Sequence, residues 1–148
     1  MFLNAPLQHP SSGGVAISKA IFGEGLERFT YQFFEVFDDL TSVAGMPLVA
    51  KECRFVEDFN DQENFAKRFC SMQSKAKIVA EAFNKKLGEI KRLHPKTPRV
   101  SFLDCSVYYV PTEDKGKEKA ILVERKLEGE FMKWNTNNGV SFVSLTMI

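Results

Sequence analysis

Short runs of alternating apolar and polar residues dominate both halves of the chain and enclose one long stretch with a different period. Alternation with a period of two is typical of strands that bury one face, and turn residues such as Gly and Pro separate such strands. Antiparallel strands combined with one long helix define an α+β fold. The pattern predicts strands at 15–21, 29–36, 47–54, 100–110 and 120–124.

The central stretch, 61–92, repeats apolar residues at intervals of three and four, which is the period of an amphipathic helix. Asp61 stands where an N-cap is expected, and Pro95 follows the basic end as a stop signal. We expect the apolar stripe to pack on the sheet as core and the basic outer face to be solvated. The stripe consists of Phe65, Phe69, Met72, Ala76, Val79, Ala80, Phe83, Leu87 and Ile90.

Composition narrows the class of protein. A chain of 148 residues fits one domain, and 44% hydrophobic residues with 14 Phe are ample for a core. The net charge of +1 gives no general attraction to nucleic acid or anionic membrane. No apolar run approaches the ~18 residues that cross a bilayer, and no signal peptide is evident, which favours a cytoplasmic protein. The isolated cysteines indicate neither a disulfide framework nor a metal site, and we interpret them as reduced thiols.

The stretch 123–139 changes character abruptly. It begins as the end of a buried strand, turns polar at Glu124, and continues through Gly129, where glycine permits a bend. An Asn-rich loop follows, made of residues that tolerate left-handed backbone. A strand that runs through such a connector is typical of a hinge between two lobes. The alternative is a surface turn with a capped helix start.

Two other features point to phosphate. Gly23 and Gly25 lie between two predicted strands, where glycines let the backbone approach phosphate oxygens, and Arg28 follows as a bidentate donor. The alternative is a plain hairpin turn. Lys51 lies in an apolar strand, where a lysine is costly to bury unless it is paired. It is a candidate phosphate ligand, and the alternative is an edge lysine that faces water.

These features together resemble the α-kinases, which are atypical protein serine/threonine kinases. The resemblance covers 15–139 and includes the phosphate loop around Gly23 and the sequence around Lys51. It rests most heavily on the hinge motif, which comprises Glu124, Glu128, Gly129, Phe131, Lys133, Trp134, Asn135, Asn137 and Gly139. The resemblance implies a kinase-like N-lobe, with a twisted antiparallel sheet and one long helix. It also implies ATP with Mg²⁺ as cofactor and a protein substrate for the full-length parent.

The resemblance also assigns roles to individual residues. Lys51 would be the catalytic lysine and would hold phosphates together with Arg28, while Gly23 and Gly25 would give backbone room. Glu124 and the backbone from Arg125 to Leu127 would lie at the adenine. The phosphate end of the nucleotide cleft would be bordered by Asn135, Asn137 and Asn138. No metal ligand is assigned to any residue of the sequence.

The sequence contains no Asp, Glu, His or Cys after Glu130. In the α-kinases the catalytic carboxylates, the magnesium ligands and a structural zinc site come after the Asn-rich loop, in a C-lobe. We therefore expect a flexible leader at 1–14, a nucleotide-binding lobe at 15–139 and a truncated tail at 140–148. Such a chain would be inactive in phosphoryl transfer. The alternative function is a non-catalytic protein-interaction module with the shape of a kinase N-lobe.

Overall fold

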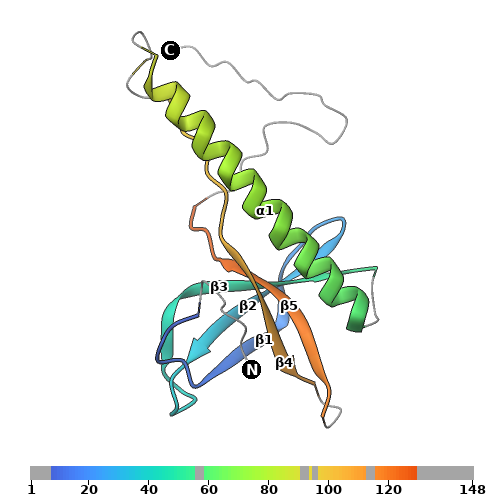
Figure 1. Ribbon diagram of the computed structural model, residues 1–148. Helices are drawn as coiled ribbons and strands as arrows, with labels where there is room; N and C mark the ends of the chain where they lie inside the picture. Colours follow the sequence, from blue (N-terminus) through green and yellow to red (C-terminus); the bar gives the residue numbers. More distant parts are fainter. Residues whose placement is uncertain (1–7, 56–58, 91–93, 95–96, 113–115, 130–148) are drawn as a thin grey trace.

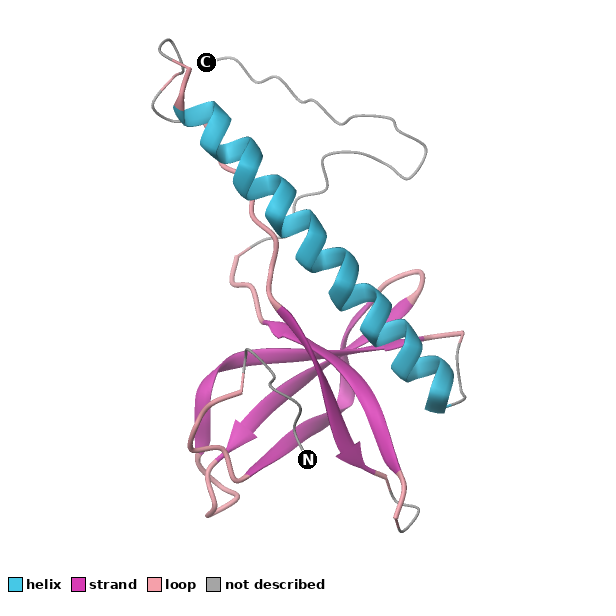
Figure 2. Cartoon of the chain, in the orientation of Figure 1, coloured by secondary structure: helices cyan, strands magenta, loops and turns pink. Residues whose placement is uncertain are grey.

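The computed structural model describes residues 8–55, 59–90, 94, 97–112 and 116–129. The described chain forms a five-stranded sheet and a long helix that leaves the sheet at an angle (Figures 1 and 2). The elements are β1 (Gly14–Glu24), β2 (Arg28–Val36), β3 (Val43–Cys53), α1 (Phe59–Gly88), β4 (Cys105–Pro111) and β5 (Glu118–Arg125).

The strands are ordered β1-β2-β3-β5-β4, and each neighbouring pair is antiparallel. The first three strands follow one another through short turns, and the β1–β2 turn is closed by a hydrogen bond from Gly25 N to Arg28 O of 2.9 Å. Helix α1 then carries the chain across the sheet, so that β5 pairs with β3 and β4 lies at the edge. The expected fold, an α+β lobe with a twisted antiparallel sheet and one long helix, is confirmed.

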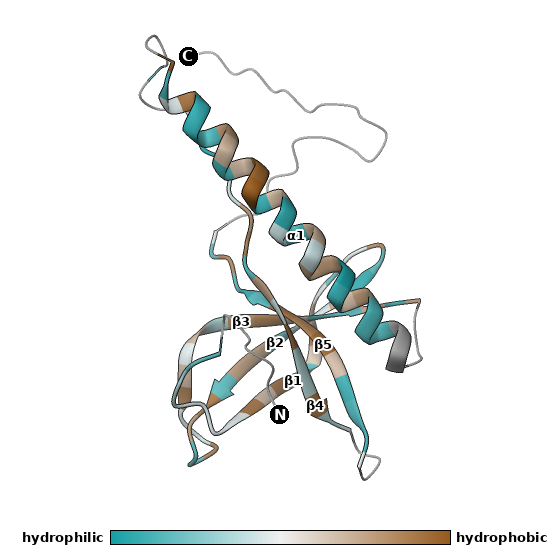
Figure 3. Ribbon diagram, in the orientation of Figure 1, coloured by the Kyte–Doolittle hydropathy of each residue, from teal (hydrophilic) through white to brown (hydrophobic). Residues whose placement is uncertain are grey.

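The sheet curls until one of its faces packs against itself. Phe33 on β2 and Tyr108 on β4 belong to strands that are not neighbours, yet their rings meet edge to face at a centroid distance of 5.0 Å. Apolar side chains therefore fill the inside of the curl. In Figure 3 the brown segments of the strands mark hydrophobic residues. The buried core cluster comprises Phe33, Leu48, Ala50, Tyr108, Val110, Ile121 and Val123.

One acidic group lies inside this core. Glu35 is only 1% exposed, and its carboxylate accepts hydrogen bonds from the Tyr108 hydroxyl at 3.0 Å and from His9 N at 2.8 Å. Gly13 N also donates to Val36 O at 2.9 Å. Residues 8–13 of the expected leader are thus bound to β2, because they supply a donor that a buried carboxylate requires. Residues 1–7 of that leader lie outside the described residues.

The Tyr108 hydroxyl should make the fold sensitive to alkaline pH. Burial and the hydrogen bond to Glu35 raise the pKa of Tyr108 above its ordinary value of 10.0. The folded chain therefore holds this proton more tightly than the unfolded chain, so the stabilisation is fully present below pH 10.0 and is lost as the pH rises further. Urea denaturation should show the free energy of unfolding falling as the pH rises above ~10.

The variant Tyr108→Phe should reduce that fall without removing it, because the pKa values of Tyr31 and Tyr109 are also raised. The same variant should lose about 1–3 kcal/mol at neutral pH, since Glu35 loses a donor. An unchanged pH dependence in Tyr108→Phe would show that this hydrogen bond is not what couples the fold to alkaline pH.

Helix α1 differs from the expectation in two ways. It begins at Phe59 and ends at Gly88, so that Asp61 lies inside the helix and is not its N-cap. Its apolar stripe is also not core throughout: Ala80 is 5% exposed, but Met72, Val79 and Phe83 are 61%, 68% and 49% exposed. The expectation was wrong for these side chains because a helix of ~45 Å is longer than the sheet it crosses, and α1 continues past the sheet edge (Figure 1).

The segment before β4 was also misassigned, since the strand expected at 100–110 begins only at Cys105. Residues before it run beside α1 and are fixed to it by side chains (Figure 1). Asn84 donates to Val100 O at 2.6 Å and accepts from Val100 N at 3.0 Å, and Lys77 pairs with Asp104 at 2.7 Å.

Within the described ranges, no helix is long and apolar enough to cross a membrane.

Candidate nucleotide-binding site

The strand register places several predicted site residues in one row. Gly23 lies opposite Thr30, Thr30 opposite Lys51, and Lys51 opposite Leu122, across four adjacent strands. Residues directly opposite each other in an antiparallel pair share a face of the sheet. The glycine turn and Lys51, which are far apart in sequence, therefore lie on the same face.

Helix α1 packs on that same face, as the position of Arg28 shows. Arg28 precedes Thr30 by two residues and so shares its face, and its guanidinium lies 4.2 Å from the ring centroid of Phe69 and 5.5 Å from that of Phe65. Both rings belong to α1. A cation over an aromatic face is attracted by the ring quadrupole, which fixes the arginine between sheet and helix.

Lys51 forms the closest polar contact of the site. Its Nζ lies 2.5 Å from Glu124 Oε2, and the side chains are 24% and 3% exposed. Glu124 is opposite Val49, two residues from Lys51, so the two charges are diagonal neighbours on β3 and β5. A buried carboxylate is costly unless it is paired, and Lys51 supplies that partner. In return the carboxylate fixes an ammonium group that has further N–H donors for a ligand.

Arg28 and Lys51 form a pair of cations on this face. Arg28 is opposite Cys53, two residues from Lys51, and such diagonal positions are about 7–8 Å apart between Cα atoms. Since Lys51 is held by Glu124 and Arg28 by two aromatic rings, both cations are positioned before any ligand arrives.

The glycine turn leaves space beside these cations. A Cβ at Gly23 would come no nearer than 3.8 Å to Thr30, and one at Gly25 no nearer than 3.8 Å to Arg28 O. Neither glycine has a left-handed backbone, so the turn itself does not require them, and the room is available to a ligand. Glu24, which would repel phosphate, is turned to Arg54 at 2.7 Å and is 54% exposed.

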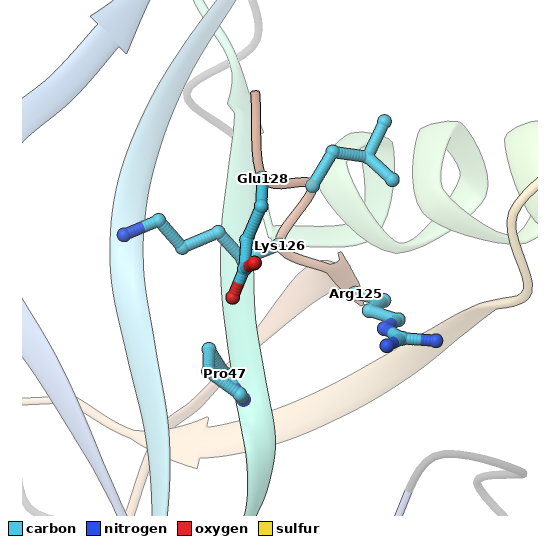
Figure 4. A pocket seen from close by; sticks show the side chains of 5 residues that line it. Pro47, Arg125, Lys126 and Glu128 are labelled. Carbon is cyan, nitrogen blue, oxygen red and sulfur yellow. The ribbon is translucent and has the colours of Figure 1, made fainter.

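The segment after β5 borders a pocket of about 420 Å³, which is lined by Pro47, Arg125, Lys126, Leu127 and Glu128. Lys126 N donates to Pro47 O at 2.9 Å, which holds this segment against β3. Arg125 and Lys126 leave the chain in opposite directions (Figure 4), and Lys126 Nζ lies 4.8 Å from the centroid of the Phe22 ring on β1. This contact joins the β1–β2 hairpin to the hinge segment.

The structure brings together only part of the predicted set. Gly23, Arg28, Lys51 and Glu124 share the helix side of the sheet, and Arg125 and Leu127 line the pocket at the hinge end. Asn135, Asn137 and Asn138 lie outside the described residues, as do Phe131 and Trp134. Sequence reasoning missed the contributions of Phe22, Phe65, Phe69, Pro47 and Lys126.

Sequence reasoning also placed Glu124 at the adenine without recognising its bond to Lys51. A signal was present, because Lys51 and Glu124 each follow directly on the apolar run of their strand, and the two charges are opposite. Among the described residues, no three His, Cys, Asp or Glu side chains gather as a metal site.

Gly129 ends the described part of the hinge with a φ of +96°, a conformation that side chains other than glycine rarely adopt. Gly129→Ala should therefore cost about 1 kcal/mol of folding free energy, measured by urea denaturation, although no atom of the described residues would touch the new Cβ. Gly88→Ala is the matched control, because Gly88 is equally open and lacks a left-handed φ. Equal stabilities for the two variants would contradict the strain at Gly129.

Comparison with known proteins assigns the family. The family model described as the alpha-kinase family matches residues 23–146. This chain belongs to the α-kinase family, as the fold and the motif at the hinge indicated. No curated protein matches the chain.

Solved structures agree on the fold. The alpha-kinase domain of myosin heavy chain kinase A in complex with AMP has a TM-score of 0.64 and 18% identity, over 86% of this chain and 60% of that one. The same domain in complex with AMP-PNP has a TM-score of 0.62 and 18% identity, over 88% of this chain and 59% of that one. An inactive form of the domain in complex with ATP has a TM-score of 0.62 and 18% identity, over 88% of this chain and 60% of that one. This chain thus spans about 60% of the length of these domains.

Proposed function

We propose that this chain binds ATP on the helix side of its sheet, as the nucleotide-binding part of a protein serine/threonine kinase. One observation carries the proposal above the others. Lys51 is fixed by the buried carboxylate of Glu124 and lies in register with the glycine turn, which leaves room for a ligand. The family assignment and the nucleotide complexes of the similar domains support this interpretation.

In this proposal each group has a defined task. The ammonium of Lys51 and the guanidinium of Arg28 stabilise phosphate charge, and Gly23 and Gly25 admit the phosphates close to the backbone. The backbone of 124–127 lies at the adenine, next to the pocket that Pro47 helps to line. We further propose that the lobe extends over 15–139 and that Asn135, Asn137 and Asn138 border its phosphate end.

Mg²⁺ is required for phosphoryl transfer, because it neutralises charge on the phosphates. The described residues do not fit a magnesium site, since their acids do not cluster. Glu124 binds Lys51, Glu52 binds Lys119 at 2.8 Å, and Glu24 binds Arg54. We therefore propose that Mg²⁺ enters with ATP.

The same distribution of acids predicts that the 148 residues alone do not transfer phosphate to protein. Transfer needs a carboxylate that orients the incoming hydroxyl, and Glu124 and Glu52 are already paired with Lys51 and Lys119. An assay with radiolabelled ATP, purified chain and a general protein substrate should give no label above background. Lys51→Ala is the control. Label that appears with the wild-type chain and disappears in Lys51→Ala would overturn this expectation.

A further inference from the structure

A second arginine, Arg54, holds the glycine turn between β1 and β2. Arg54 directly follows β3, and its backbone N donates to Glu27 O at 2.9 Å. Its guanidinium Nη1 donates to Gly25 O at 3.0 Å and lies 2.7 Å from the carboxylate of Glu24. The end of β3 is therefore bonded to three residues at the turn, through one arginine.

The turn depends on such bonds because its own side chains anchor it poorly. Gly25 has no side chain, and Leu26 is 74% exposed. The hydrogen bond from Gly25 N to Arg28 O closes the turn but joins it only to its own hairpin. Fixing a turn in one position costs conformational entropy, which contacts with the rest of the chain must offset. The charge-assisted bonds of Arg54 are strong contacts of this kind.

Arg54 reaches the turn from the face of the sheet that Lys51 does not occupy. Its guanidinium carbon lies 4.8 Å from the ring centroid of Phe29. Phe29 precedes Thr30, which shares the face of Lys51, so the alternation along β2 puts Phe29 on the other face. Glu24 is opposite Phe29 and lies on that other face as well. Arg54 thus supports the turn from behind, away from a ligand on the Lys51 side.

We propose, on the basis of the nucleotide site proposed above, that Arg54 is a positioning residue for ATP. It acts through the turn and does not touch the ligand: it holds the backbone of 24–27 where that backbone meets the phosphates. A turn that is already fixed needs no ordering when ATP binds, whereas without Arg54 the cost of ordering weakens binding. Adenosine has no phosphate to meet the turn, so its binding should not depend on Arg54.

The test is isothermal titration calorimetry of the full chain with ATP and with adenosine. Arg54→Ala should bind ATP about three- to tenfold more weakly than wild type and should bind adenosine equally. Lys119→Ala is the matched control. Lys119 pairs with Glu52, which is opposite Phe29, so this variant removes one positive charge from the same face without a contact to the turn. It should bind both ligands as the wild type does.

A double variant separates positioning from charge. Arg54→Ala leaves the carboxylate of Glu24 without its partner, and that charge would itself repel phosphate. Arg54→Ala combined with Glu24→Gln removes the charge and should still bind ATP more weakly than wild type. If the double variant bound ATP as tightly as wild type, Arg54 would only neutralise Glu24, and the positioning role would be wrong.

A measurement without ligand follows the turn itself. In ¹⁵N relaxation experiments, the amides of 25–27 should move more freely in Arg54→Ala than in wild type or Lys119→Ala, and unchanged amides would contradict the proposal. Equal ATP affinity of Arg54→Ala and wild type would overturn the role of Arg54 and leave the nucleotide site standing. A parallel loss of adenosine binding would show a general structural role and would also contradict it. A wild-type chain that binds no ATP would overturn the nucleotide site and the role of Arg54 with it.

Discussion

Lys51→Ala should weaken ATP binding by about ten- to a hundredfold. The substitution removes a charge-assisted contact to the phosphates, and contacts of this kind contribute about 1.5–3 kcal/mol. Adenosine, which has no phosphate, should bind wild type and variant equally. Isothermal titration calorimetry with both ligands measures the difference.

The control for charge is Lys119→Ala. Lys119 also pairs with a glutamate of β3, at 2.8 Å from Glu52, and it is 37% exposed. It is opposite the core residue Val110, and therefore lies on the face of the sheet that Lys51 does not occupy. Lys119→Ala should leave ATP affinity unchanged. An equal loss of ATP affinity in both variants would show that the effect of Lys51→Ala comes only from the change in net charge.

Loss of Lys51 also leaves the Glu124 carboxylate buried without its partner, which should cost about 1–3 kcal/mol, given that Lys51 is partly exposed. Adding Glu124→Gln removes the orphaned charge and should recover most of that stability. It should not recover ATP affinity. This pair of measurements separates the binding role of Lys51 from its role in the fold.

Phe33→Ala should have the largest effect on stability. Phe33 is 0% exposed and its ring contacts Tyr108 where the sheet closes on itself. Truncation of a buried phenylalanine costs about 3–5 kcal/mol, which is a large share of the total stability of a small domain. Thermal denaturation followed by circular dichroism should show a melting temperature lowered by more than ten degrees, or no cooperative transition.

Phe55→Ala is the matched control for Phe33→Ala, because Phe55 is 73% exposed and lies outside the sheet. It should leave the melting temperature almost unchanged. If both variants melted alike, the self-packed face of the sheet would not be the core of the fold.

The elements could be predicted from the sequence because alternation and helical periodicity are local properties. The strand order could not, since alternation shows which residues of one strand share a face but not which strand lies beside it. Lys51 and Glu124 illustrate the difference. Each was singled out as unusual within its own strand, but they are 73 positions apart and meet only because β5 pairs with β3.

The helix shows a second limit of the same kind. Its periodicity predicted which face is apolar but carried no information on how far the sheet extends beneath it. Ala80 is buried, whereas Val79 and Phe83 belong to the same stripe and are exposed. The partners of Arg28 were also hidden, because cation–aromatic contacts between β2 and α1 follow from packing and not from a motif.

The most direct test of the nucleotide site is an ATP titration of the ¹⁵N-labelled chain followed by NMR. Chemical-shift changes should concentrate on the backbone amides of 23–28, Lys51 and 124–128, and should saturate. Tyr108 and Lys119, on the opposite face, should change little. Changes that instead gather on the basic face of α1, at Lys75, Lys85 and Lys86, or that never saturate, would contradict a nucleotide site on the helix side of the sheet.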